Sequence, residues 1–131
     1  MITVKPIQEK ELQQRLAALC HIPYRAELLA YSAWNDQGDF AGICQFGMDA
    51  EGGHLFDLAT PTENDPDDSL FVMGRAALNF IDLCGVRVAY FDGETEGKDA
   101  LLRRIGFEKN ETGRYSFVVA GFFTKTCKCE H

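Results

Sequence analysis

The stretch Leu101-Leu102-Arg103-Arg104-Ile105-Gly106-Phe107 narrows the choice of fold more than any other part of this 131-residue chain. Its three aliphatic side chains share one side of a helix predicted over residues 97–105, and its two arginines lie on the other side. Gly106 predicts the end of this helix, because glycine readily adopts the left-handed backbone found after a helix. A closing hairpin follows, with strands over 107–109 and 114–123.

Upstream of this stretch, short apolar runs alternate with helical patterns. The predicted elements are a strand over 2–5, which Pro6 stops, a helix over 7–20, strands over 28–34, 40–46 and 54–60, a helix over 69–84 and a strand over 86–91. The fold class is therefore α+β, one domain over 1–123 with a mixed, mostly antiparallel central sheet and helices on both faces. The element order is β-α-β-β-β-α-β-α-β-β, and a cysteine-rich tail at 124–131 follows.

The composition excludes several classes of protein. A net charge of −7 and a pI near 4.9 argue against nucleic-acid or anionic-membrane binding, which needs clustered lysine and arginine. Neither a membrane-spanning run nor a secretory signal is evident, so we expect a cytoplasmic protein. Five cysteines, an odd number, fit a reducing compartment, and we expect Cys44 and Cys84 to be buried.

The charges are unevenly distributed along the chain. Residues 26–73 contain no lysine or arginine but ten acidic residues. A negative field of this kind would concentrate a cationic partner, such as a small cationic amine or a basic peptide. The alternative is a solvated acidic face that favours solubility.

The element order, the stretch at 101–107 and the sequence Leu58-Ala59-Thr60-Pro61 together resemble the GNAT superfamily of N-acetyltransferases. The resemblance covers nearly the whole chain in topology. It implies that acetyl-CoA lies between two parallel central strands, with its pyrophosphate on the N-terminus of the next helix. The implied cofactor contacts are Leu58, Ala59, Thr60, Asp68, Ser69, Leu70 and Thr95.

Two departures from the family pattern keep a second function open. No glycine occurs between Gly53 and Gly74, where the family has a glycine-containing phosphate loop, and acidic residues there would repel phosphate. Leu102 stands where the family has a tyrosine that protonates the leaving thiolate. The resemblance thus implies an acyl-CoA-dependent N-acyltransferase for a cationic amine, and the alternative is a non-catalytic GNAT-like module that binds a basic ligand or protein.

Three residues are candidates for the chemistry of acyl transfer. Asp57 lies on the strand that would line the acetyl site, where a carboxylate could remove a proton from the attacking amine. Tyr90 or Tyr115 could replace the missing tyrosine acid. The alternatives are a strand carboxylate that faces solvent and core tyrosines with satisfied hydroxyl groups.

The C-terminal tail and the remaining aromatic and histidine residues give weaker indications of function than the residues above. Cys127, Cys129 and His131 could hold zinc if the tail is extended, although a fourth ligand is required and an inert tail is the alternative. His54, at the start of a strand, is interpreted as structural. The three strands predicted over 28–34, 40–46 and 54–60 form an antiparallel meander, and its aromatic residues are interpreted as core. They are Trp34, Phe40, Phe46 and Phe56.

Overall fold

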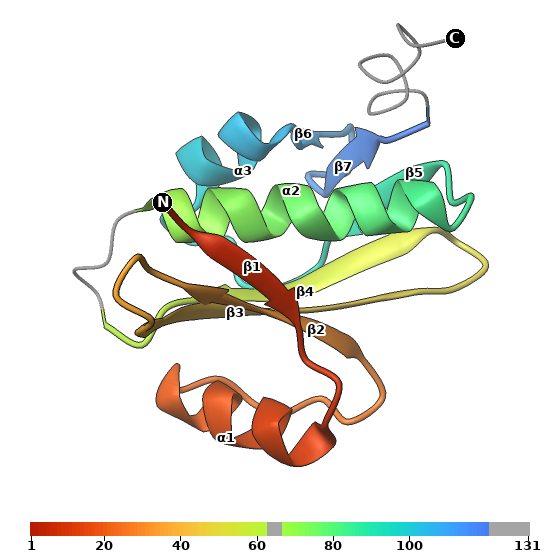
Figure 1. Ribbon diagram of the computed structural model, residues 1–131. Coiled ribbons are helices and arrows are strands. Elements are labelled where there is room, and N and C mark those ends of the chain that lie inside the picture. Colours follow the sequence, from red (N-terminus) through yellow and green to blue (C-terminus); the bar gives the residue numbers. More distant parts are fainter. Residues whose placement is uncertain (63–66, 121–131) are drawn as a thin grey trace, which may run out of the picture.

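The computed structural model describes residues 1–62 and 67–120, without the side chain of Asp67, and its element order is the predicted one. The elements are β1 (Thr3–Pro6), α1 (Lys10–Leu19), β2 (Leu29–Trp34), β3 (Phe40–Met48), β4 (Gly53–Ala59), α2 (Asp67–Leu83), β5 (Val88–Phe91), α3 (Asp99–Ile105), β6 (Glu108–Lys109) and β7 (Tyr115–Val118), as labelled in Figure 1. Both the α+β class and the order of elements are confirmed.

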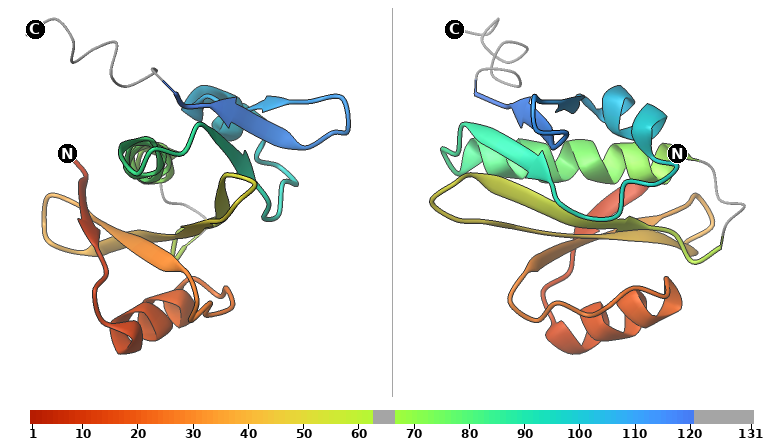
Figure 2. Two further views of the ribbon diagram at one scale, coloured as in Figure 1. Left: turned by 90° about the vertical axis from the view of Figure 1, so that its right-hand side faces the viewer. Right: turned by 180° about the vertical axis from the view of Figure 1, so that it is seen from behind.

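The strands form one seven-stranded sheet in the order β1-β2-β3-β4-β5-β7-β6. Neighbouring strands are antiparallel except β4 and β5, which are parallel. Helix α1 covers one face, whereas α2 and α3 lie on the other (Figure 2). The predicted mixed sheet with helices on both faces is therefore confirmed.

Two apolar cores flank the sheet. The larger core contains the inward side of α2, whose buried residues Met73, Ala77, Leu78 and Ile81 recur at helical spacing. The smaller core lies under α1 and includes Leu16. Within the described residues, no helix is both long and apolar enough to cross a bilayer.

Several details differ from the sequence-based expectation. Pro6 belongs to β1 instead of stopping it, because an edge strand tolerates proline. Helix α1 starts at Lys10 and not at Ile7, whose backbone N–H donates to the carbonyl of Ala30. Cys44 is buried as expected, but Cys84 is exposed because it follows the end of α2.

The aromatic residues of the meander are only partly core. Phe46 is buried, whereas Trp34, Phe40 and Phe56 are half-buried. The predicted strand over 114–123 ends at Val118, and residues 121–123 lie outside the described part of the chain. The position of Phe56 matters most, because it lies where two central strands separate.

Candidate functional site

Strands β4 and β5 separate after a short paired stretch. Their parallel register ends where Leu55 lies opposite Phe91, and the N–H of Asp92 donates to the carbonyl oxygen of Leu55 at 2.8 Å. A Cβ at Gly93 would lie 1.9 Å from the carbonyl oxygen of Phe56, so the chain can pass here only because residue 93 is glycine. Beyond this contact, β4 continues to Ala59 without a registered partner among the described residues of β5.

A β-bulge lies on the other side of β4 at the same level. Gln45 of β3 is opposite Asp57, but the next residue, Phe46, is opposite Leu55, so Phe56 is the extra residue. A bulge bends its strand and increases the local twist. The bulge therefore lies at the level at which the β4–β5 register ends.

The separation of the strands opens a cleft of about 380 Å³. Its walls are residues 56–59 of β4, Phe91 at the end of β5, Arg25 and neighbouring residues of the α1–β2 loop, and Glu94 and Lys98 before α3. A concave site of this size, with apolar walls and a few converging polar groups, is typical of a small-molecule site.

Asp57 forms part of the cleft wall, as the sequence led us to expect for a candidate base. Its side chain is 9% exposed, and Arg25 Nε and Gln45 Nε2 each donate to its Oδ2 at 2.7 Å. Within the described residues, no group donates to its Oδ1. One carboxylate oxygen is thus held in place by the protein, and the other can accept a proton or bind a cation.

Two buried glutamines hold the α1–β2 loop against this aspartate. Gln13 of α1 donates from Nε2 to Gln45 Oε1 at 2.9 Å and to the carbonyl of Arg25 at 3.1 Å. Gln45 accepts the N–H of Arg25 at 3.1 Å and donates to the carbonyl of Pro23 at 2.9 Å. Because every amide group is paired, the network can fix the cleft wall without leaving a buried polar atom unsatisfied.

Sequence reasoning missed this network, although a signal for it exists. Gln13 precedes Leu16 by three residues and Ala17 by four, so it lies on the buried side of α1, and it is fully buried. Gln45 lies inside an apolar run of β3 and is also fully buried. Polar residues on buried faces need partners, so both positions could have been marked as members of a polar network.

The charge of the cleft is more balanced than the acidic bias of residues 26–73 suggests. Arg25 and Lys98 contribute cations, and Asp57 and Glu94 contribute carboxylates. Arg25 precedes the acidic stretch and Lys98 follows it in sequence, yet the fold brings both to the same opening. A ligand in this cleft therefore meets both signs of charge.

The predicted cofactor contacts do not all lie together. Leu58 and Ala59 line the cleft, and Thr60 follows them, with its hydroxyl donating to the carbonyl of Thr62 at 2.7 Å. Thr95 accepts the N–H of Lys98 through its carbonyl oxygen. Leu58 and Ala59 are therefore the predicted contacts that the structure brings to the cleft itself.

The start of α2 is described only in part. Asp68 Oδ1 lies 3.4 Å from Arg104 Nη2, Ser69 is buried, and Leu70 packs against the larger core. Residues 63–66, the centre of the expected phosphate loop, lie outside the described residues. The expectation that acidic residues there repel phosphate stays a prediction.

Neither candidate tyrosine lines the cleft. Tyr115 is buried and its hydroxyl donates to Asp99 Oδ1 at 2.5 Å, a bond that raises the pKa of the tyrosine. Tyr90 stacks on His54, with ring centroids 5.7 Å apart, and Arg114 lies 3.8 Å from the Tyr90 ring centroid. The structure thus separates both hydroxyl groups from Asp57.

A second polar cluster lies at the opposite end of β4. His54 Nδ1 lies 2.6 Å from Asp92 Oδ2, and His54 Nε2 lies 2.9 Å from Asp49 Oδ1. Burial opposes a charge on His54, but the hydrogen bonds to Asp92 and Asp49 and their charges outweigh it and raise the pKa of His54. Both ring nitrogens of His54 are therefore paired within a charged cluster, in keeping with a structural role.

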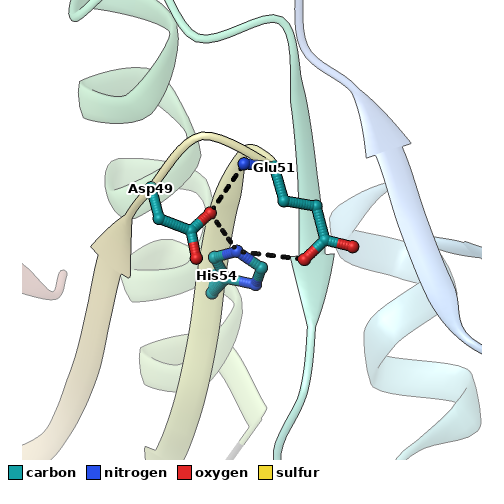
Figure 3. A group of neighbouring side chains, drawn as sticks. All are labelled: Asp49, Glu51 and His54. Atoms are coloured by element: carbon teal, nitrogen blue, oxygen red, sulfur yellow. Dashed lines mark hydrogen bonds and ion pairs between the residues drawn. The ribbon is translucent and has the colours of Figure 1, made fainter.

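Asp49, Glu51 and His54 lie close enough together to suggest a metal site, as Figure 3 shows. Their ligand atoms are within 4.8 Å of one another. However, Arg114 donates to both oxygens of Glu51, at 2.6 and 3.4 Å, and His54 already bonds to two carboxylates. Arg114 and a protonated His54 offset two of the three negative charges of Asp49, Glu51 and Asp92, so these groups are already paired with one another within the protein. The predicted zinc ligands Cys127, Cys129 and His131 lie outside the described residues.

Comparison with known proteins identifies the fold. No protein-family model matches the sequence, and no curated protein matches it. An Escherichia coli N-acetyltransferase for an alanine of a ribosomal protein matches with a TM-score of 0.67 and 11% identity, covering 92% of this chain and 95% of that chain. A spermidine N-acetyltransferase that is a chimera of Vibrio cholerae SpeG and hSSAT matches with a TM-score of 0.68 and 10% identity, over 93% of this chain and 98% of that chain.

A third solved structure has a bound ligand. It is the PaiA N-acetyltransferase of Thermoplasma acidophilum in complex with coenzyme A, which matches with a TM-score of 0.65 and 12% identity, over 90% of this chain and 99% of that chain. Matches of this quality along nearly the whole length establish the fold that these proteins share.

Proposed function

We propose that this chain, which has the GNAT fold, transfers an acyl group from acetyl-CoA or a related coenzyme A ester to an amine that is a cation in solution. The observation that carries the proposal is the cleft between the separating ends of β4 and β5, with Asp57 in its wall. The similarity to solved N-acetyltransferases supports it, since one of them is a complex with coenzyme A and another is named for spermidine.

The residues of the cleft fit the thioester end of a coenzyme A ester. Phe56, Leu58 and Phe91 supply apolar walls, and β4 beyond Leu55 offers an edge that β5 does not cover. When bound, the coenzyme supplies an activated acyl group. We propose that Leu58 and Ala59 hold this end of it, and the other proposed contacts are Thr60, Asp68, Ser69, Leu70 and Thr95.

Asp57 is the proposed base. Its Oδ2 is fixed by Arg25 and Gln45, so its Oδ1 can bind the ammonium group of the acceptor and take one proton from it. The acceptor is then a neutral amine with a free lone pair, which is the nucleophilic form. Phe56 and Leu58 lie on both sides of Asp57 in the cleft wall, and they limit the access of water to its carboxylate.

The test measures release of free thiol from acetyl-CoA by the purified 131-residue protein in the presence of a panel of amines. Replacing Asp57→Asn should lower kcat/KM by about 100-fold or more, because a positioned general base contributes about 10²–10⁴-fold. The matched control Asp39→Asn removes the same charge from an exposed turn between β2 and β3 and should keep wild-type activity. Circular dichroism would show that both variants fold.

The proposal has a clear contrary outcome. If acetyl-CoA neither raises the melting temperature nor releases thiol with any amine of the panel, the chain is no acyltransferase. Stabilisation by amines alone, without thiol release, would instead support the non-catalytic binding module.

A further inference from the structure

Arg25 uses only part of its hydrogen-bonding capacity. Its Nε donates to Asp57, and its guanidinium carbon lies 5.3 Å from the centroid of the Phe56 ring. Within the described residues, no acceptor is bonded to Nη1 or Nη2, and the side chain is 32% exposed in the cleft wall. The two terminal nitrogens of the planar guanidinium fork, with two N–H groups each, are therefore available to a ligand.

The position of this fork is fixed before any ligand binds. Gln45 accepts the backbone N–H of Arg25, and Gln13 donates to its carbonyl oxygen. Both glutamines are fully buried, so the loop that carries Arg25 is anchored in the interior. Preorganisation of this kind lowers the entropic cost of binding, because the side chain is already held on both its backbone and its Nε.

Arg25 and Asp57 together present two charges side by side. The bond between Nε and Oδ2 is 2.7 Å long, and within the described residues the Nη atoms of Arg25 and Oδ1 of Asp57 have no hydrogen-bond partner. A ligand that satisfies both must carry an anion close to its ammonium group. A polyamine has no such anion and would place a second positive charge near Arg25.

We propose that the acceptor carries a carboxylate adjacent to its amine, as an amino acid does, and that Arg25 is the residue that selects it. The inference rests on the proposed function, since it names the acceptor class of that reaction. Arg25 Nη1 and Nη2 donate to the carboxylate as a fork, and Asp57 Oδ1 binds the ammonium group. Lys98, the other cation of the cleft, offers a point charge without this planar geometry.

The experiment measures binding to the full chain by titration calorimetry, with and without free coenzyme A. The probes are the standard amino acids, the carboxamides of those that bind, and spermidine. We expect an amino acid to bind and its carboxamide to bind about 10- to 100-fold more weakly, the loss expected for a charged, paired hydrogen bond. Binding of spermidine or a carboxamide as tightly as the amino acid would overturn the inference, and so would no binding by any amino acid.

Variants identify the residue responsible. Arg25→Gln should remove the preference for the acid over the amide, and Arg25→Lys should weaken it, because lysine cannot reach Asp57 and the ligand with separate nitrogens. Arg15→Gln, on the exposed side of α1, is the matched control and should keep the preference. If Lys98→Gln removes the preference and Arg25→Gln does not, the assignment to Arg25 is overturned.

Failure of the inference is distinguishable from failure of the proposed function. Thiol release with simple amines, together with equal binding of acids and amides, would contradict only the inference. A preference for acids that Arg25→Gln removes, without any thiol release, would contradict the acyl transfer and leave Arg25 as the residue that selects a carboxylate ligand.

Discussion

The two ends of β4 carry similar groups in different states of pairing. At its beginning, Arg114 lies 3.8 Å from the centroid of Tyr90 and pairs with carboxylates. At its end, Arg25 lies 5.3 Å from the centroid of Phe56 and pairs with Asp57. Each end thus combines an arginine, an aromatic ring and acidic groups.

The difference lies in the hydrogen bonds that remain unused. All three guanidinium nitrogens of Arg114 donate, to Asp92 and to Glu51. Within the described residues, Nε is the only guanidinium nitrogen of Arg25 that has an acceptor, and this side chain lines the cleft. We call the cluster of Asp49, Glu51, His54, Asp92 and Arg114 saturated, because every guanidinium nitrogen in it has an acceptor. The saturated cluster joins the turn between β3 and β4 to the neighbouring ends of β5 and β7. The group around Arg25 is unsaturated and can bind a ligand.

The largest effect on stability should come from the buried glutamine network that supports the cleft at the end of β4. Gln45→Leu removes four hydrogen bonds at once and leaves the carboxylate of Asp57, the carbonyl of Pro23 and the N–H of Arg25 without this partner. We expect the free energy of unfolding to fall by about 3–5 kcal/mol, the range for breaking a buried charged network. Urea denaturation measures it.

The matched control for this change is Gln14→Leu. Gln14 is exposed on α1 and should change stability by less than about 0.5 kcal/mol. Equal stability of the two variants would show that the glutamine network does not hold the cleft wall.

The second prediction distinguishes the role of Arg114 from that of Arg25. Arg114→Gln leaves the acidic groups around His54 without their guanidinium and should lower the melting temperature, by less than Gln45→Leu does, because this cluster is half-exposed. Its kcat/KM should stay within about twofold of wild type, since no atom of Arg114 faces the cleft walls. For Arg25→Gln we expect the reverse, a smaller fall in melting temperature and a larger loss of kcat/KM than for Arg114→Gln. Thermal denaturation and thiol release, measured on both variants, would refute the contrast if Arg114→Gln lost activity as strongly as Arg25→Gln.

The sequence predicts much of the fold but little of this contrast. Periodicity and turn residues gave every element, because they depend on neighbours a few residues apart. Asp57 was found because it is the carboxylate, between the apolar residues Phe56 and Leu58, on the strand that the GNAT resemblance places at the acetyl site. The partners of Asp57 were not found: Arg25 and Asp57 are 32 residues apart, as are Gln13 and Gln45, and they meet only because α1 and the loop after it pack against β3 and β4.

The bulge at Phe56 explains a further part of what was missed. One extra residue in β4 determines which side chains face the cleft, and no local pattern marks it. The exposed Cys84 shows the same limit, since a shift of one residue at the end of α2 decides between core and solvent.

A smaller effect concerns the pH dependence of the saturated end. The pKa of His54 is raised above its ordinary value of 6.5, so the folded protein holds this proton more tightly than the unfolded chain does. The resulting stability is complete below pH 6.5 and is lost as the pH rises through the folded-state pKa. His54→Gln, which is neutral at every pH, should be less stable than wild type by about 1 kcal/mol at pH 6, with a smaller difference at pH 8.

The surroundings of His54 support this direction. The charged groups around the His54 ring are Arg114 and the carboxylates of Asp49, Glu51 and Asp92. Because the pKa values of all three carboxyl groups are lowered, they stay charged throughout this pH range. His21→Gln, which removes an imidazole at an exposed position, is the control. A difference between wild type and His54→Gln that grew from pH 6 to pH 8 would contradict the argument.

The smallest effect tests whether chemistry at the cleft needs a tyrosine acid. Tyr115 donates its hydroxyl proton to Asp99, which also pairs with Arg103, and this bond raises the pKa of Tyr115. A hydroxyl with a raised pKa and a carboxylate acceptor outside the cleft is poorly suited to protonate a thiolate there. Tyr115→Phe should therefore leave kcat for thiol release within about twofold of wild type. The matched variant Tyr90→Phe should behave alike, because its ring belongs to the saturated cluster. A loss of tenfold or more in one variant, with its melting temperature unchanged, would mark that tyrosine as the acid and move part of the chemistry away from the end of β4.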